Sequence, residues 1–265
     1  MAEAEVFKKL ADLFPDNPPI VDEDTVVNYI IEKAKEAVQY GSFFDLLISG
    51  DQGVGKSTLA LYIMFKYYGD RDKVLKNIFF NVDELNETLL NEKREIVLLD
   101  DAGVSLSKYR ALNEVAVDYY ALQQIARTRV SVIIYTTVHD NLAKFIRDIV
   151  DVVVVIHTRK GNKSYGAVYR KKRKYFTVVS KKYDFAMNLD KLHSDAVFHN
   201  IYVEYNERRE RFVRQIVEEL LKKKKERDEK EEIDKFEQKI KRLEDEKFMK
   251  FMKKVDELKK QYKRE

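Results

Sequence analysis

The chain has 265 residues, of which 45% are hydrophobic and 36% are charged, and its formal net charge is +4. This length and apolar content are enough for one large domain with a buried core. The absence of cysteine excludes disulfides and thiolate metal sites, and the four histidines do not have metal-ligand spacing. No apolar run approaches the roughly 20 residues of a membrane span, and residues 1–10 lack the apolar segment of a signal peptide. We therefore expect a cytoplasmic protein.

The positive charge is concentrated in one segment. Residues 159–182 contain ten basic residues and no acidic one, whereas the rest of the chain before residue 207 is acidic overall. An acidic body with one strongly basic segment predicts a local footprint for an anionic partner.

Residues 1–40 are expected to form an N-terminal helical segment attached to the core. A short helix near residues 3–13 precedes the three prolines of the chain, Pro15, Pro18 and Pro19. A second helix with apolar periodicity is expected to begin at Asp24 or Thr25.

The most informative stretch covers residues 43–69, where Gly50, Gly55, Lys56 and Ser57 match the pattern G-x-x-x-x-G-K-[ST]. An apolar strand-like run precedes the motif and an apolar-periodic helix follows it, which is the context of a phosphate-binding loop. Lys56 is predicted to reach the β and γ phosphates, and the Ser57 hydroxyl to bind Mg²⁺. The predicted nucleotide-binding residues are Gly50, Asp51, Gln52, Gly53, Val54, Gly55, Lys56, Ser57 and Thr58.

An acidic pair follows a second apolar run at residues 95–103, EIVLLDDAG. Four consecutive apolar residues suit a parallel strand buried on both faces, and ligands bind at the carboxyl ends of such strands. Asp100 is therefore the predicted Walker B carboxylate that holds Mg²⁺ with Ser57. Asp101 occupies the position at which many such ATPases carry the glutamate that polarises the attacking water. An aspartate reaches one methylene less far, so nucleotide binding without turnover stays an alternative.

Further alternating elements complete the predicted fold. Strands are expected at residues 78–82, 130–137 and 152–156, and helices at residues 83–90, 111–126 and 141–149. The alternating order predicts an α/β fold with a central parallel five-stranded sheet and helices on both faces. The strand at residues 130–137 ends in Thr136 and Thr137, of which Thr137 is the predicted contact of the attacking water or the γ phosphate.

Over roughly residues 43–156 these motifs resemble the additional-strand (ASCE) class of P-loop ATPases. The phrase IVLLDDAG followed by SVIIYTT is similar to the DnaC, IstB and DnaA group of helicase loaders and initiators. The arginines after the long helix, the polar-tipped strand and Ile146-Arg147 are similar to the FtsK and HerA motors with their viral packaging and Zot-like relatives. The resemblance implies a RecA- or AAA+-like fold, ATP and Mg²⁺ as cofactors, and a ring or other homo-oligomer. It also implies an arginine supplied to a neighbouring site, for which Arg147 is the first candidate and Arg129 the second.

Residues 157–184 are predicted to extend the core, residues 41–184, by a basic antiparallel β segment at the sheet edge. Its Lys and Arg side chains would displace counterions from a nucleic-acid backbone, and its interleaved aromatics would stack on bases, so DNA is the predicted partner. The alternatives are protection of the sheet edge against strand association, or a surface for an acidic protein. The candidate nucleic-acid-binding residues are Arg159, Lys160, Lys163, Arg170, Lys171, Lys172, Arg173 and Lys174.

Residues 185–265 are expected to form a charged helical arm or hairpin. Neither Gly nor Pro follows Tyr205, and 39 of the last 59 residues are charged. A step of five between the apolar residues Leu243 and Phe248 interrupts the heptad, which argues against a long coiled coil. The arm is either the oligomerisation element or a solvated helix.

Together these features predict an ATP-hydrolysing protein that acts on DNA as an oligomer, as a packaging or translocation motor or as a replication initiator or helicase loader. A small-molecule or nucleoside kinase and a nucleotide-gated scaffold are the alternatives. The guanine signature Asn-Lys-x-Asp does not occur in the chain, which argues against a GTPase.

Overall fold

The structure is a computed structural model, and it describes residues 20–102, 126, 128–138, 150–173 and 177–262. The chain divides into two units, Met1–Arg208 and Arg209–Glu265. The predicted helices at residues 3–13, 111–126 and 141–149 lie wholly or almost wholly outside the described residues.

The first unit is built on an eight-stranded sheet with the order β1-β8-β7-β6-β2-β5-β4-β3. Its strands are β1 (Ile20–Asp22), β2 (Phe44–Gly50), β3 (Ile78–Phe79), β4 (Arg94–Leu99), β5 (Val130–Thr137), β6 (Val152–Lys160), β7 (Lys163–Arg173) and β8 (Thr177–Asn188). Five neighbours, β6-β2-β5-β4-β3, run parallel, which confirms the predicted central sheet. The strands β6, β7 and β8 pair antiparallel, as expected for the basic segment, and the short β1 adds a parallel strand beyond β8.

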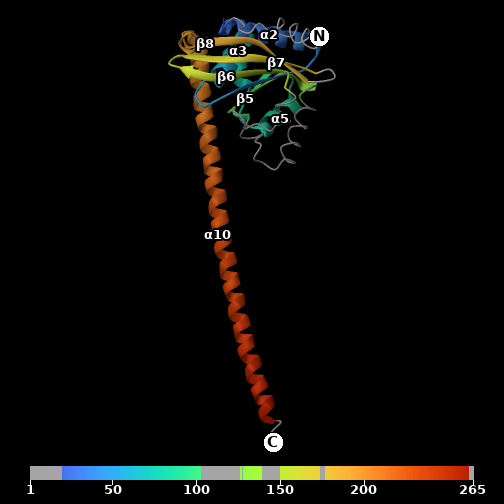
Figure 1. Cartoon of the computed structure of the whole chain (residues 1–265), viewed down its shortest axis with the longest axis vertical. Helices are drawn as coiled ribbons and strands as arrows, with labels where there is room; N and C mark the ends of the chain where they lie inside the picture. Colours follow the sequence, from blue (N-terminus) through green and yellow to red (C-terminus); the bar gives the residue numbers. More distant parts are fainter. Residues whose placement is uncertain (1–19, 103–125, 127, 139–149, 174–176, 263–265) are drawn as a thin grey trace, which may run out of the picture. The chain divides into compact units, whose positions relative to one another are not determined.

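Helices cover both faces of the parallel strands. The helices of the described residues are α2 (Glu23–Tyr40), α3 (Lys56–Tyr68), α4 (Arg71–Lys76), α5 (Val82–Asn91), α9 (Leu189–His193) and α10 (Ala196–Tyr262). Figure 1 shows α2 and α3 on one side of the sheet and α5 on the other. The core on the α5 side contains Leu47, Val97 and Ile133. Alternate residues of the same strands, such as Leu46 and Ile134, are also fully buried, because successive side chains of a strand point to opposite faces.

Residues 20–40, the described part of the segment before the phosphate loop, pack into this core. The helix α2 buries Val26, Ile30 and Ala34 completely, and β1 pairs with β8. The helix begins one residue earlier than expected because the Asp22 side chain accepts a hydrogen bond from the Thr25 N–H. Likewise α5 begins at Val82, one residue before the expected start, because the Asn81 side chain accepts a hydrogen bond from the Asp83 N–H.

The chain after residue 184 also contributes to the first unit. The strand β8 continues to Asn188, beyond the predicted boundary, and α9 and the first residues of α10 follow it. Phe198, Ile201 and Tyr205 of α10 are buried. These apolar and aromatic side chains explain why the core ends near Arg208, the last residue of the first unit.

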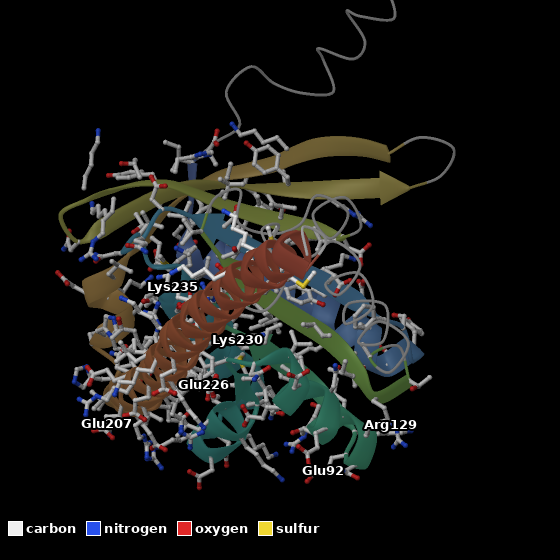
Figure 2. The ribbon with its side chains drawn as sticks, turned by 90° about the horizontal axis from the view of Figure 1, so that it is seen from below. Glu92, Arg129, Glu207, Glu226, Lys230 and Lys235 are labelled. Atoms are coloured by element: carbon white, nitrogen blue, oxygen red, sulfur yellow. The ribbon has the colours of Figure 1, made fainter. Side chains whose placement is uncertain are left out.

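The second unit, residues 209–265, is described as a continuous part of α10 up to Tyr262, so it is a helix and not a hairpin. Charged side chains such as Glu226, Lys230 and Lys235 are exposed along it (Figure 2). Among the described residues, no helix is long and apolar enough to cross a membrane.

Candidate nucleotide site

The predicted phosphate loop connects β2 to α3, as its sequence pattern requires. Gly53 and Gly55 adopt positive φ angles of 75° and 96°, and Gly55 caps the first turn of α3. This conformation favours glycine and turns the loop onto the helix N-terminus, where backbone N–H groups and the helix dipole attract phosphate. Lys56 is the first residue of α3, and its Nζ donates a hydrogen bond to the Asp51 carbonyl at 2.6 Å. The Lys56 side chain therefore contacts the backbone of the predicted phosphate loop.

The antiparallel strands form the wall behind this loop. The Ser164 hydroxyl of β7 is fully buried and donates to the Val54 carbonyl at 2.7 Å. Arg159 of β6 donates from Nη1 to the Gly53 carbonyl at 3.1 Å and from Nε to the Gly161 carbonyl at 2.8 Å. Two strands of the segment that was predicted to bind nucleic acid therefore also contact the phosphate loop. These contacts place Arg159 beside the phosphate loop, and its predicted contact with nucleic acid stays a prediction.

An open cavity of about 520 Å³ lies between the exposed part of the phosphate loop and the end of β6. The lining residues are Asp51, Gln52, Gly53, Val54, His157, Thr158, Arg159 and Gly161.

The acidic pair directly follows β4, close to the start of α3. The Asp100 carboxylate is completely buried and accepts hydrogen bonds from three hydroxyl groups. On Oδ1 these come from Ser57 at 2.8 Å and Thr136 at 2.5 Å, and on Oδ2 from Tyr205 at 2.5 Å. Asp100 and Ser57, which are 43 residues apart in the sequence, are thus brought into direct contact, as the predicted site requires.

Burial dominates the electrostatics of Asp100. Removal from water raises the pKa of its carboxyl group above the usual value, and the neighbouring Asp101 raises it further. The hydrogen bonds from Thr136, Tyr205 and Ser57 act in the opposite direction because they favour the ionised form. The site therefore holds a carboxylate in an environment that a nearby cation would stabilise.

Asp101 has an unusual backbone conformation. Its φ is +48°, and it is the only non-glycine residue with positive φ among the residues that the structure describes. Its N–H donates to the Thr136 hydroxyl at 2.9 Å. Left-handed backbone at a non-glycine residue costs energy and often occurs at functional sites.

Thr136, and not Thr137, contacts the acidic pair. Its hydroxyl donates to Asp100 and accepts from the Asp101 N–H. The Thr137 hydroxyl, although the residue is also buried, donates to the Val138 carbonyl at 3.1 Å. The sequence places both threonines at the end of β5, and the direction of each side chain follows from the strand alternation.

Magnesium fits the chemistry of the residues that meet here. Mg²⁺ prefers hard oxygen ligands, and usually one or two carboxylates together with phosphate oxygens. The Ser57 hydroxyl and the Asp100 carboxylate supply such oxygens at the N-terminus of α3.

The other predicted residues are distributed over the first unit. Arg129 directly precedes β5 and therefore lies at the amino-terminal edge of the parallel sheet, opposite the phosphate loop. Lys160 and Lys163 are exposed at the turn between β6 and β7, and Arg170 is partly exposed on β7. Lys171, Lys172 and Arg173 belong to β7. Arg147 and Lys174 lie outside the described residues.

Comparisons with known proteins agree with this site. A model of the family described as Novel STAND NTPase 3 matches residues 26–165, a range that contains the phosphate loop and the acidic pair. The chain is 32% identical over 119 residues to "Uncharacterized protein ORF286" of Acidianus two-tailed virus. The aligned region covers 42% of this chain and 42% of that protein. The chain is 29% identical over 207 residues to "Uncharacterized protein B-251" of Sulfolobus spindle-shape virus 1, over 71% of this chain and 82% of that protein. The match to the ORF286 protein thus spans less than half of its length.

Among solved structures, the chain is similar to the N-terminal domain of zonular occludens toxin from Neisseria meningitidis. The sequence identity is 13% and the TM-score 0.38, over 58% of this chain and 98% of that one.

Proposed function

The chain belongs to the Novel STAND NTPase 3 family and is a P-loop NTPase of the additional-strand class, and we propose that it binds and hydrolyses ATP with Mg²⁺. In this proposal the protein works as an oligomer and uses the cycle of ATP binding and hydrolysis to act on DNA. The observation that supports it most directly is the 2.8 Å hydrogen bond from Ser57 to Asp100. It joins the phosphate loop to the acidic pair across β5, the strand that lies between β2 and β4.

Each residue of the site then has a distinct part in hydrolysis. Lys56 exchanges its hydrogen bond to the Asp51 carbonyl for oxygens of the β and γ phosphates. Ser57 and Asp100 would hold Mg²⁺, which when bound would neutralise the charge that develops on those phosphates. Asp101 accepts a hydrogen bond from the attacking water, and Thr136 orients Asp101 through its backbone N–H. The water oxygen bonds to the γ phosphorus while the bond from that phosphorus to the β–γ bridging oxygen breaks, and the products are ADP and phosphate. Asp101 takes up the proton that the water loses and releases it to solvent.

Action on DNA is supported by the strand that links the phosphate loop to the basic segment. Ser164 lies at one end of β7 and donates to the loop, and Arg170 to Arg173 lie at the other end of the same strand. A change in the loop can therefore be carried along β7 to positive charges that suit a phosphate backbone.

Self-association is supported by the second unit and by Arg129. Along the helix of the second unit, Val213, Val217, Leu220 and Leu221 are each about half exposed, and their spacing places them on one side of a helix. Arg129 lies at the sheet edge away from the phosphate loop of its own chain, so we propose that it reaches the site of a neighbouring subunit, where arginine stabilises the transferring phosphoryl group.

The test of the nucleotide site is phosphate release from ATP, measured with no DNA, with single-stranded DNA and with double-stranded DNA. We expect activity that DNA stimulates in the wild type and that is lost in Lys56→Ala. The matched control is Lys35→Ala, which removes an exposed lysine from α2 and should leave the rate unchanged. Transfer of phosphate to a small acceptor, without a response to DNA, would instead show a kinase.

The test of the DNA surface replaces Arg170–Lys174 with glutamine and measures DNA binding over a range of salt concentrations. We expect weaker binding and a flatter dependence of log K on log salt, by about one in slope for each phosphate contact removed. The control replaces the basic residues at 222–225 and 227 of α10, so the same number of positive charges is removed elsewhere. Equal effects of the two variants would contradict a specific DNA surface on β7.

The test of self-association is the solution mass with and without nucleotide, by light scattering. We expect a multimer of the wild type and a smaller particle for a variant with Val217, Leu220 and Leu221 changed to glutamine. An unchanged mass in that variant would show that this part of α10 does not contribute to self-association.

A further inference from the structure

The Asp100 carboxylate has a partner that the phosphate loop and the sheet do not provide. Tyr205 lies on α10, 105 residues after Asp100, and its hydroxyl donates to Asp100 Oδ2 at 2.5 Å. Asp100 is fully buried and Tyr205 is 1% exposed. A buried tyrosine hydroxyl that donates to a carboxylate forms a strong, charge-assisted hydrogen bond. This bond connects the start of α10 directly to Asp100, the candidate metal ligand.

Several contacts fix this part of α10 on the core. The ring of Phe198 packs against Tyr62 and Phe65 of α3, with centroids 5.3 and 5.8 Å apart. The Tyr205 ring lies 5.9 Å from that of Phe80, which follows β3. The next turn is held by polar contacts.

In that turn, Arg71 of α4 pairs with Glu204. Arg208 donates to the Leu75 carbonyl at 2.8 Å. The position of the Tyr205 hydroxyl is therefore set by the packing of the whole turn and not by a single flexible side chain.

The three hydroxyl donors to Asp100 come from three different elements. Ser57 belongs to α3, which begins at the phosphate loop, and Thr136 belongs to β5. Tyr205 is the donor from α10. A carboxylate held in this way has a fixed orientation, and ligands of a metal are commonly oriented by such hydrogen bonds.

We infer that Tyr205 is a positioning residue of the nucleotide site, which orients Asp100 for Mg²⁺ and so makes the packing of residues 196–208 of α10 depend on the bound nucleotide. This inference rests on the proposed function. The dependence runs in both directions, because coupling between two sites is reciprocal: if the packed turn strengthens the binding of Mg²⁺ with nucleotide, the bound ligand stabilises the packed turn by the same factor.

The first test compares Tyr205→Phe with Tyr202→Phe in the full chain. The control removes a hydroxyl one turn earlier on α10, from a ring that packs against His193 at 4.4 Å and whose hydroxyl has no hydrogen-bond partner among the described residues. Binding of a non-hydrolysable ATP analogue is measured by calorimetry with Mg²⁺ and with EDTA.

We expect Tyr205→Phe to weaken binding in Mg²⁺ by about tenfold or more, the usual effect of losing a partner of a metal ligand. Binding in EDTA should not change, and Tyr202→Phe should match the wild type in both conditions. A merely structural tyrosine would weaken binding equally with and without Mg²⁺, and that result would overturn the inference.

The second test measures hydrogen exchange of the backbone amides of residues 196–208. In the wild type, the analogue with Mg²⁺ should slow exchange there more than the analogue with EDTA. In Tyr205→Phe this difference should disappear. The wild-type measurement is informative even if the variant does not fold.

If the analogue binds in both Mg²⁺ and EDTA but the wild type exchanges at the same rate in both, the inference is wrong. The proposed function would not be affected by that result. A wild type that binds no nucleotide under any condition would overturn the proposed function, and this inference with it.

Discussion

Replacing Thr136 with valine removes one hydroxyl and leaves the shape of the side chain nearly unchanged. In the structure this buried hydroxyl donates to Asp100 Oδ1 and accepts from the Asp101 N–H. The variant leaves each of these two groups without that partner. Since an unsatisfied buried polar group costs about 1–3 kcal/mol, and Oδ1 keeps its bond from Ser57, we expect a loss of about 2–4 kcal/mol.

That loss is a large part of the roughly 5–15 kcal/mol by which a folded domain is stable. For a unit of this size it corresponds to a decrease in Tm of roughly 5–15 °C. The assay is thermal and urea unfolding of the nucleotide-free protein, followed by circular dichroism. Two controls accompany it: Thr136→Ser keeps the hydroxyl, and Thr137→Val removes the one that donates to the Val138 carbonyl.

We expect Thr136→Ser to stay within about 1 kcal/mol of the wild type, and Thr137→Val to lose less than Thr136→Val. If Thr136→Val unfolds within about 0.5 kcal/mol of the wild type, its hydroxyl does not hold the acidic pair in the way described. The part given to Thr136 in orienting Asp101 would then be wrong as well.

Three further changes test other contacts. Ser164→Ala should cost about 1–3 kcal/mol and weaken binding of an ATP analogue, because it removes the donor to the Val54 carbonyl; Ser164→Thr, which keeps a hydroxyl, is the comparison. Gly166→Ala should destabilise the protein by about 1–3 kcal/mol or more, as a Cβ there would lie 2.3 Å from a backbone oxygen of β6, and unchanged urea unfolding would contradict that close approach. Burial raises the pKa of Tyr68 to about 12, so the folded state keeps a proton that the unfolded chain loses near pH 10; stability should decrease by about 2–3 kcal/mol between pH 10 and 12, and less in Tyr68→Phe when unfolding is measured in urea across that range.

The central sheet and the phosphate loop could be predicted from the sequence because their signals are local. The apolar runs around Leu47, Leu98 and Ile133 match buried strands, and the glycine and lysine spacing of the loop has few other uses. The contact between Ser57 and Asp100 followed from these two local patterns, since the carboxyl ends of parallel strands meet at one edge of the sheet.

Contacts that depend on the tertiary fold carried no such signal. Ser164 and Arg159 reach the phosphate loop only because β6 and β7 extend past the end of β2, and the sequence showed these strands as a basic segment. Tyr205 stands among charged residues in a helical pattern, and nothing in its immediate sequence marks it as a partner of Asp100. The choice between Thr136 and Thr137 depended on which face of β5 each one occupies.

The hydrogen bond between Asp100 and Tyr205 also sets an order of events during synthesis. The phosphate loop and the acidic pair are synthesised well before residue 205, because Tyr205 lies 105 residues after Asp100. Domains generally fold as units during translation, and here the unit is complete only when the start of α10 has emerged.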